Sequence, residues 1–333
     1  MYGEYLELCL KGERFCAYPY SGVPNSLWNI YPTRGIRLGR VMRILCGLKL
    51  DRVLLKKVEF PLLRYGVSEA QFCRFVSCGV GCNAIDIAFA WPSPERSSDR
   101  IYAYAMDKGN GELIGYIKIA TSQREIERLS REYSVLVELD RRIPHKKFEF
   151  PSAKGITSFT GDIEACLFQP LPVDAPRWVR WTKDSWDRDI VPIKEEISAG
   201  TYRHISREDA YRLDWVMRFL AKATRRQKES LSSALENGLD VCATHGDMAC
   251  QNFRKYKGRY WLFDWEEFTM EGPIRADELS FRLSTYVYDM GLTFRESVPK
   301  MPKRDFIVAA AFQIANEMSF KKELAELLDG GMT

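Results

Sequence analysis

Residues 245–252 read HGDMACQN and residues 263–266 read FDWE. Phosphoryl transfer from ATP needs a divalent metal ion held against the phosphates and a group placed near the acceptor hydroxyl. Asp247 is followed five positions later by Asn252, and a second aspartate, Asp264, follows after a short strand-like hairpin. The first aspartate can orient or deprotonate a hydroxyl, and the other two residues carry the oxygen ligands that Mg²⁺ prefers. These three residues therefore predict a site for metal-assisted phosphoryl transfer.

Three strand-like runs lie upstream of this stretch. Residues 85–91, 100–106 and 113–120 are apolar with alternating side chains, and the glycine-containing turn DKGNG joins the second run to the third. This pattern predicts a three-stranded antiparallel meander. Apolar residues at helical spacing then continue to Pro144, which predicts a helix directly after the third strand.

A lysine on the third strand and a glutamate on the following helix would form a phosphate clamp. Lys118 lies in GYIKIA, and Glu132 lies 14 residues later, which fits a strand end, a turn and about three helical turns. An ordinary surface lysine on an edge strand is the alternative for Lys118. Other glutamates on the same helix compete with Glu132 for this role: Glu125, Glu127 and Glu138.

The motifs together resemble the aminoglycoside phosphotransferase and choline kinase family, which has a protein-kinase-like fold. The matching parts are HGDMACQN, FDWE and the later pair Gly272 and Asp277, in the family's order. The resemblance covers the chain from about Ile85 to its C-terminus, and residues 1–75 lie outside it.

The resemblance implies a role for each matching residue. Asp247 would be the catalytic base or hydroxyl-orienting group, and Asn252 and Asp264 would be the Mg²⁺ ligands. Lys118 would bind the α- and β-phosphates of ATP, and Glu132 would hold Lys118 in place by an ion pair. In addition, His245 and Asp277 would support the catalytic loop, and backbone groups around Phe168–Leu171 would meet adenine. Apart from the resemblance, Glu266 could either help to position the metal loop or form a structural ion pair.

The loop expected to cover the phosphates departs from the family pattern. Residues 92–99 read PSPERSSD and contain no glycine, although glycines let backbone N–H groups approach phosphate closely. The hydroxyls of Ser97 and Ser98 could contribute instead. An alternative places this loop at Gly79 and Gly81, in CGVGCN, if the strand assignment is one strand late.

Composition and charge set outer bounds on function. The chain has 333 residues, 46% hydrophobic and 28% charged, which predicts a folded globular protein. Its net charge of +4 is too small to indicate nucleic-acid binding. Nine cysteines without CxxC pairs and only three histidines disfavour a zinc site, and acidic residues near the start disfavour a signal peptide. We therefore expect reduced cysteines and a cytoplasmic location.

The N-terminal part is basic, with twelve Lys or Arg against six Asp or Glu in residues 1–75. Within it, residues 34–64 mix apolar and basic side chains at three- and four-residue spacing, which predicts one or two amphipathic helices. Such helices could contact an anionic membrane or could be the solvated face of a packed helix. An acidic run over residues 184–196 could attract a cationic acceptor or could be a solvated loop.

The expected fold is α+β and bilobal, with a small antiparallel β-sheet lobe carrying one helix and a larger, mainly helical lobe. Residues 1–75 would be an extension, residues 76–170 the nucleotide-binding lobe and residues 171–333 the catalytic and acceptor-binding lobe. No activation segment of the protein-kinase type is recognisable after Asp264.

The expected function is an ATP- and Mg²⁺-dependent phosphotransferase, with GTP as a second possible donor. Its acceptor would be a small-molecule hydroxyl on a sugar, an amino sugar or an amino alcohol. The alternatives are a pseudokinase-like nucleotide-binding or scaffolding protein and an aminoglycoside resistance kinase. No sequence pattern indicates the oligomeric state.

Overall fold

The computed structural model describes residues 4–10, 13–22, 36–91, 99–142, 147–160, 162–169 and 179–330. Three sequence predictions therefore lie wholly or partly outside the described residues: the start of the basic stretch at Arg34, the loop at 92–98 and the end of the adenine segment at 170–171. Within the described ranges, none of the helices combines the length and apolarity that crossing a membrane requires. The chain divides into two compact units, Met1–Arg141 with Pro151–Arg177, and Arg142–Phe150 with Trp178–Thr333. We call them the sheet unit and the helical unit.

The sheet unit is built on one antiparallel sheet in the order β3-β1-β2-β4-β5-β6-β9-β8. The predicted meander is confirmed, because β4, β5 and β6 pair in sequence with antiparallel register. Three strands from the N-terminal part extend the same sheet through the pairing of β2 with β4. The strands are β1 Tyr5–Leu10, β2 Glu13–Pro19, β3 Lys56–Val58, β4 Ile85–Ala90, β5 Arg100–Asp107, β6 Leu113–Ala120, β8 Ala153–Thr160 and β9 Ile163–Phe168.

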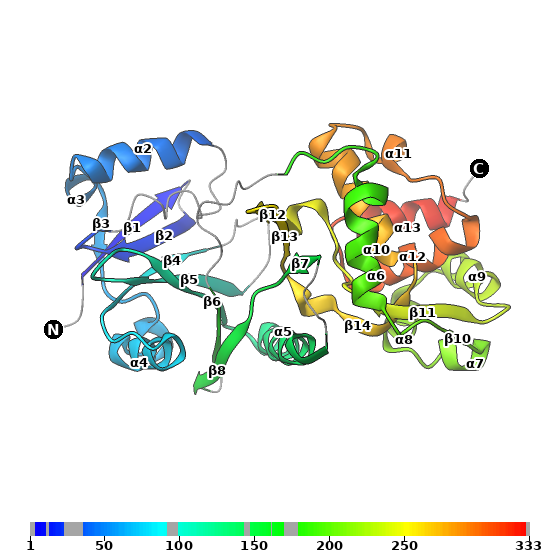
Figure 1. The fold of residues 1–333 in the computed structure, drawn as a ribbon, viewed down its shortest axis with the longest axis horizontal. Helices are drawn as coiled ribbons and strands as arrows, with labels where there is room; N and C mark the ends of the chain where they lie inside the picture. Colours follow the sequence, from blue (N-terminus) through cyan, green and yellow to red (C-terminus); the bar gives the residue numbers. More distant parts are fainter. Residues whose placement is uncertain are drawn as a thin grey trace. The chain divides into compact units, whose positions relative to one another are not determined.

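Helices cover both faces of this sheet (Figure 1). On one face, Phe72 and Val76 of α4 pack into a core with strand residues such as Ile117. On the other face, Met42 of α2 packs against Tyr18. The helices are α2 Ile36–Gly47, α3 Asp51–Leu54, α4 Glu69–Val80 and α5 Gln123–Arg142, with a short 3₁₀ turn η1 at Leu63–Tyr65. The amphipathic helices predicted for the basic stretch correspond to α2 and α3.

The alternative phosphate loop at CGVGCN is wrong. Gly79 lies in the last turn of α4, where a β-carbon would come within 2.3 Å of the Leu167 side chain. Gly81 ends α4 in the left-handed conformation, with φ of 71°. These glycines therefore serve helix packing and helix termination, and neither lies in a turn between two strands.

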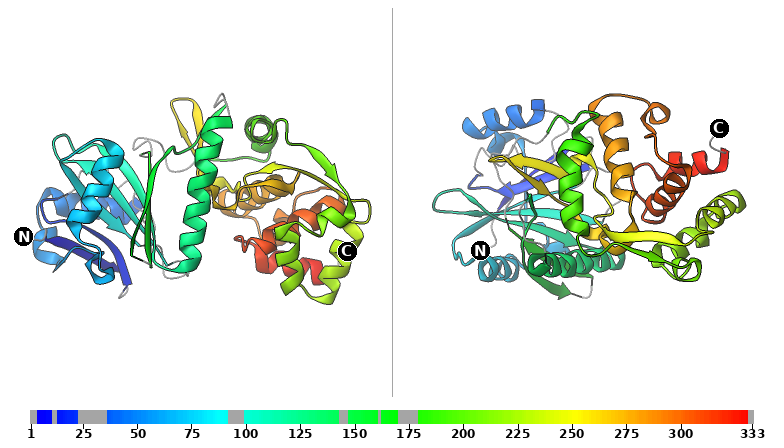
Figure 2. Two further views of the ribbon diagram at one scale, coloured as in Figure 1. Left: turned by 90° about the horizontal axis from the view of Figure 1, so that it is seen from below. Right: turned by 45° about the vertical axis from the view of Figure 1, so that its right-hand side comes forward.

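The helical unit has a core of α-helices and two three-stranded sheets, β10-β11-β14 and β12-β13-β7. α12 is apolar on all sides and packs against α8, α9, α10 and α13, so these helices gather around it (Figure 2, orange and red beside lime). The strands of the helical unit are β7 Phe148–Glu149, β10 Arg203–Ile205, β11 Leu239–Thr244, β12 Phe253–Tyr256, β13 Arg259–Leu262 and β14 Thr269–Pro273. Its helices are α6 Val191–Ser198, α7 Arg207–Ala210, α8 Asp214–Lys222, α9 Arg225–Ala234, α10 Ala276–Ser284, α11 Phe294–Ser297, α12 Lys303–Ala315 and α13 Lys321–Gly330, with short turns η2 Trp186–Ile190, η3 Cys250–Asn252, η4 Trp265–Glu267 and η5 Thr285–Asp289.

The two units together give the α+β fold that the sequence predicts, one unit dominated by an antiparallel sheet and the other by helices. The predicted helical character of the larger lobe includes α7, α8 and α9 within residues 206–238 and α12 and α13 near the C-terminus. The nine cysteines are all free thiols, and four of them are buried.

Candidate active site

The loop from residue 245 to residue 252 joins β11 to β12 and is held by one face of α10. The buried Asp277 carboxylate accepts hydrogen bonds from the backbone N–H groups of His245, at 3.1 Å, and Gly246, at 3.0 Å. A carboxylate bound by two consecutive N–H groups fixes the direction of the backbone at that point. The loop therefore enters the site in a defined orientation.

Two serines of the same helix face hold the rest of the loop. Ser280 Oγ donates to Asp247 Oδ1 at 3.4 Å, and Ser284 Oγ accepts from the N–H of Cys250 at 2.8 Å. Residues 277, 280 and 284 lie on one helix face because they follow the three- and four-residue spacing of an α-helix. α10 therefore aligns the loop at its start, middle and end.

Gly246 is the tightest point of this loop. Its φ of 90° lies in the left-handed region, and a β-carbon there would come within 2.3 Å of the Glu267 carbonyl oxygen. Gln313 of α12 donates to the Gly246 carbonyl oxygen at 3.2 Å. Both the conformation and the close approach of two backbone segments require glycine here.

We expect Gly246→Ala to lower the free energy of unfolding by about 3 kcal/mol, because left-handed strain and overpacking against rigid backbone add together. The matched control is Gly258→Ala, since Gly258 also has a positive φ, of 80°, but has open space around its α-carbon. That control should lose only about 1 kcal/mol. Urea unfolding of both variants measures the difference, and equal losses would contradict the packing explanation.

His245 is a structural member of the loop. Its Nδ1 accepts a hydrogen bond from the backbone N–H of Asp247 at 3.2 Å, so that nitrogen carries the lone pair. Its Nε2 lies 3.0 Å from the carbonyl oxygen of Phe263 and therefore donates its proton to it. The ring is neutral, both nitrogens are engaged, and its edge-on contact with Trp265, at 4.5 Å between centroids, fixes its plane.

A β-hairpin brings the two predicted metal ligands together. β12 and β13 pair antiparallel with Phe253 opposite Leu262, and the N–H of Phe263 continues the ladder to the carbonyl of Asn252 at 2.9 Å. Asn252 stands just before the first strand and Asp264 just after the second, so both lie at the open end of the hairpin. Strand pairing therefore brings Asn252 and Asp264 close together in space although they are apart in the sequence.

The closed end of the hairpin is a two-residue turn. Lys257 and Gly258 both have positive φ, of 47° and 80°, which is the signature of a type I′ turn. This turn type matches the twist of the flanking strands and sets their register. The register in turn sets which residues meet at the open end.

Asp264 adopts a left-handed backbone, with φ of 68° and ψ of 63°. Aspartate tolerates this conformation better than most residues do, and such strain concentrates at functional sites. Trp265 holds it in place: its buried indole N–H donates to the Leu262 carbonyl at 3.0 Å, and its ring packs between Phe148 and Phe150, at 6.1 Å and 5.6 Å.

Carboxylates crowd around Asp247. Burial, together with the negative charges of Asp264, Glu266 and Glu267, raises the pKa of Asp247 to about 7. Asn252 opposes this rise, because its Nδ2 donates to Asp247 Oδ2 at 3.0 Å and to the Asp247 carbonyl at 2.8 Å. With its Nδ2 so bound, Asn252 turns its Oδ1 away from Asp247.

The oxygen atoms of Asp247, Asn252 and Asp264 form a donor set with excess negative charge, which fits a hard divalent cation such as Mg²⁺.

In the sheet unit, Lys118 and Glu132 form a buried ion pair. Lys118 Nζ lies 2.8 Å from each Glu132 carboxylate oxygen, and the two residues are only 6% and 2% exposed. The same Nζ lies 5.9 Å from the centroid of the Phe168 ring. Glu125, a competing glutamate, pairs instead with Arg100 at 2.6 Å. Lys118 is therefore a buried, oriented cation on β6.

The acidic run is partly neutralised by its own surroundings. Asp187 pairs with Arg282 at 3.2 Å, and Asp189 pairs with Arg188 at 2.7 Å. Glu196 accepts from the backbone N–H of Lys147 at 3.0 Å. Its attraction for a cationic acceptor is correspondingly smaller than the sequence alone suggests.

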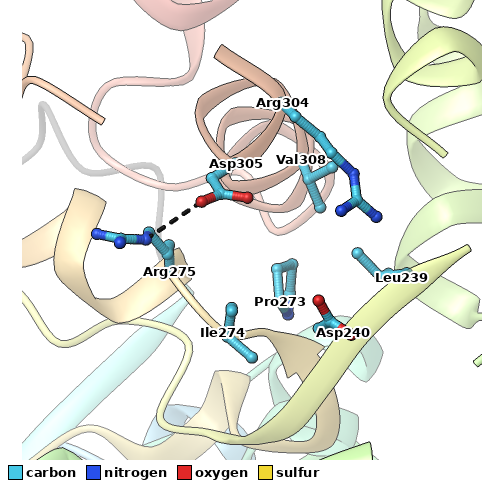
Figure 3. Close-up of a pocket in the computed structure, with 8 residues that line it drawn as sticks. All are labelled: Leu239, Asp240, Pro273, Ile274, Arg275, Arg304, Asp305 and Val308. Carbon is cyan, nitrogen blue, oxygen red and sulfur yellow. Dashed lines mark ion pairs between the residues drawn. The ribbon is translucent and has the colours of Figure 1, made fainter. Parts of the chain in front are cut away.

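A small cavity elsewhere in the helical unit does not compete with this site (Figure 3). Its volume is about 20 Å³, which is room for about one water molecule. Arg304 on its wall donates to the carbonyls of Ala234 and Gly238, and Arg275 pairs with Asp305. These charges stabilise the fold around the cavity.

The predicted residues thus form two clusters. The helical unit brings together the loop aspartate, the two proposed metal ligands and their supports: Asp247, Asn252, Asp264, His245 and Asp277. The sheet unit brings together Lys118, Glu132 and Phe168. Sequence reasoning missed Ser280, Ser284 and Gln313. The serines could have been found from their helical spacing to Asp277, whereas no sequence signal marks Gln313.

No family model and no curated protein matches the sequence. Among solved structures, a thermostable mutant of aminoglycoside phosphotransferase APH(4)-Ia in ternary complex with ADP and hygromycin B is 11% identical, with a TM-score of 0.49 over 77% of this chain and 95% of its own. Choline kinase LicA from Streptococcus pneumoniae is 14% identical, with a TM-score of 0.43 over 80% of this chain and 92% of its own. The GDP and kanamycin complex of APH(2")-IIia is 11% identical, with a TM-score of 0.44 over 79% of this chain and 98% of its own. The chain is similar to these structures at the identities and TM-scores given, and the likeness does not extend to their substrates.

Proposed function

We propose that this protein is an ATP- and Mg²⁺-dependent phosphotransferase that acts on a hydroxyl group of a small molecule. One observation carries the proposal: the β12–β13 hairpin and the α10 face bring Asn252 and Asp264 to the carboxylate of Asp247. These are the groups that phosphoryl transfer needs at a metal and at an acceptor hydroxyl.

Each residue of the loop has a distinct task in this proposal. Asp247 accepts the proton of the acceptor hydroxyl, and a pKa of about 7 suits a general base at neutral pH. Asn252 Oδ1 and the Asp264 carboxylate would hold Mg²⁺, which when bound neutralises charge on the phosphates. Asp277, Ser280 and Ser284 keep the loop rigid, so little reorganisation accompanies the reaction.

The sheet unit supplies the nucleotide-binding groups. Lys118 presents an ammonium group for the α- and β-phosphates, and the bidentate contact with Glu132 keeps its long side chain in one position. The chain around Phe168, at the end of β9, is the proposed contact for adenine or guanine, as the family resemblance implies.

A short connection after the metal loop favours a small acceptor over a protein. From Asp264 the chain passes through η4 and β14 and enters α10 at Ala276. β14 pairs with β11 in the middle of this connection, and η4 precedes it, so no long segment is left to bind a polypeptide. We propose a sugar, an amino sugar or an amino alcohol as the acceptor class.

Thermal unfolding with nucleotides tests the proposal. A ligand that binds only the folded state stabilises it by about 2.7 kcal/mol at 100 times its Kd. We expect Mg²⁺ with ATP or GTP to raise the melting temperature by several degrees, and we expect Asp264→Ala to remove the Mg²⁺-dependent part. Glu236→Ala, which removes an exposed carboxylate of the same unit, is the matched control and should respond like wild type.

A second measurement distinguishes a kinase from a nucleotide-binding scaffold. Incubation with Mg²⁺-ATP and a panel of sugars, amino sugars and amino alcohols should give a phosphorylated product with at least one compound. Nucleotide binding with no transfer to any acceptor and no ATP hydrolysis would favour the scaffold, and no stabilisation at saturating nucleotide would refute both. A growth-inhibition assay on expressing cells tests the aminoglycoside resistance alternative.

A further inference from the structure

The surface of α2 and α3 is unusually apolar. Six of the eleven exposed large hydrophobic side chains among the described residues lie within residues 41–54. Their exposed fractions run from 44% to 81%. We call this set the α2–α3 face: Val41, Ile44, Leu48, Leu50, Val53 and Leu54. Aliphatic side chains gathered in this way mark a contact surface, whereas single exposed ones do not.

The helices that carry this face are anchored to the sheet. Met42 of α2 is 2% exposed and packs into the core between this helix and the sheet. The buried Asp51 carboxylate accepts a hydrogen bond from the Tyr18 hydroxyl at 2.9 Å. The helices thus have a buried side of their own, and the exposed aliphatic side chains face outward as a second apolar side.

The charge around the face is strongly positive. Residues 41–57 contain five Lys or Arg and a single acidic residue, Asp51, whose side chain is buried. Lys49, Lys56 and Lys57 are exposed, and Lys57 pairs with Glu4 at 2.9 Å. These side chains favour a partner that is both apolar and anionic.

One of these cations occupies a backbone position that favours glycine. α2 ends in a Schellman motif, with the N–H of Leu50 bound to the Leu45 carbonyl at 2.9 Å and the N–H of Lys49 bound to the Cys46 carbonyl at 3.1 Å. Lys49 takes the left-handed position of this motif, with φ of 57°. The chain thus keeps a lysine at the exposed tip between α2 and α3 at a conformational cost.

We propose that the α2–α3 face docks onto an anionic lipid surface. Its aliphatic side chains would enter the boundary between headgroups and acyl chains, and its lysines would reach the lipid phosphates. A second copy of the chain fits less well, because a symmetric dimer would place this cationic surface against itself. The proposal is independent of the phosphotransfer chemistry.

Co-sedimentation of the full chain with lipid vesicles tests this. We expect binding to phosphatidylserine vesicles, little binding to phosphatidylcholine vesicles, and loss of binding as ionic strength rises from about 0.1 to 1 M. Lys49→Gly should reduce the partition coefficient about fivefold, which corresponds to about 1 kcal/mol per cation near an anionic surface. This variant relieves the left-handed strain, so its melting temperature should not fall.

The apolar contribution is tested with Ile44→Ser/Val53→Ser, which changes two side chains that are 61% and 81% exposed. We expect it to reduce vesicle binding by roughly tenfold or more. The controls are Met217→Ser, which changes an apolar residue of the helical unit that is 52% exposed, and Lys154→Gln, which changes an exposed lysine of β8; both variants should bind vesicles as wild type does.

Three results would overturn the proposal. They are equal binding to neutral and anionic vesicles, unchanged binding by the Ile44→Ser/Val53→Ser variant, and a vesicle-independent dimer that this variant disperses. The last result would identify the face as a protein interface. Sedimentation without lipid separates that outcome from membrane docking.

Discussion

Asp247→Asn is expected to reduce turnover by about 10³-fold while leaving Mg²⁺-nucleotide binding intact. Asparagine keeps the size of the side chain and can still accept from Asn252 Nδ2, but it cannot take a proton from the acceptor hydroxyl. General-base residues contribute about 10²–10⁴-fold to turnover, which sets the expected range. Steady-state kinetics with the best acceptor and nucleotide-dependent melting of the same preparation measure both properties. Full activity of this variant would remove Asp247 from the catalytic role.

The same substitution should change the pH dependence of stability. The pKa of Asp247 is about 7 in the folded protein, compared with an ordinary value of 3.8. The folded state therefore binds this proton more tightly than the unfolded state, and stability falls as pH rises from about 4 through 7. Asp247→Asn removes this negative charge, so it should stabilise the metal-free protein at pH 8 by about 1–3 kcal/mol and have little effect at pH 4.

Thermal melting at the two pH values checks this, with Mg²⁺ as an internal control. A cation held by Asn252 and Asp264 would favour the ionised form of Asp247. Adding Mg²⁺ at pH 8 should therefore stabilise wild type more than Asp247→Asn. A stability difference of the same size at pH 4 and pH 8 would show that the effect is not electrostatic.

Lys118→Met is expected to destabilise the sheet unit by about 3–5 kcal/mol, even without nucleotide. Methionine fills similar space, but it leaves the Glu132 carboxylate, which is 2% exposed, without its cation. Breaking one half of a buried ion pair costs far more than replacing both halves by apolar residues. The double variant Lys118→Met/Glu132→Leu should therefore recover most of the stability, although neither variant should have kinase activity.

Urea unfolding followed by circular dichroism measures both variants, with Lys154→Met as a control for removal of an exposed lysine. If Lys118→Met lowers the free energy of unfolding by less than about 1 kcal/mol, water reaches the ion pair in solution, and the pair contributes no more than a solvent-exposed pair does. If the double variant is no more stable than the single one, the loss comes from packing around β6 and not from an uncompensated charge.

The parts of the site that could be predicted from sequence are those that local structure holds together. Asp247 and Asn252 share one loop, and Asp264 follows one tight hairpin, so short spacings are enough to bring all three together. Lys118 and Glu132 are likewise joined by one strand, one turn and three turns of helix. The meander could be predicted because each strand pairs with its neighbour along the chain.

The parts that could not be predicted depend on distant pairing. β1 and β2 join the sheet next to β4 after more than sixty residues of intervening chain, and nothing in their composition names that partner. β7 pairs in parallel with β13, with Phe148 opposite Tyr260. Gln313 reaches the loop only because α12 packs against α10. In each case the contact arises from tertiary packing, which a one-dimensional spacing does not record.

The type I′ turn at Lys257 and Gly258 closes the end of the β12–β13 hairpin that carries none of the proposed site residues. Both turn residues are exposed, and the residues that matter for chemistry lie at the opposite end of the ladder. Because strand side chains repeat every two residues, the hairpin can be lengthened here by paired insertions without altering which residues meet at its base. The turn is therefore an attachment point for a fluorophore or a paramagnetic label, which would report on the loop of residues 245–252 through the strand pair.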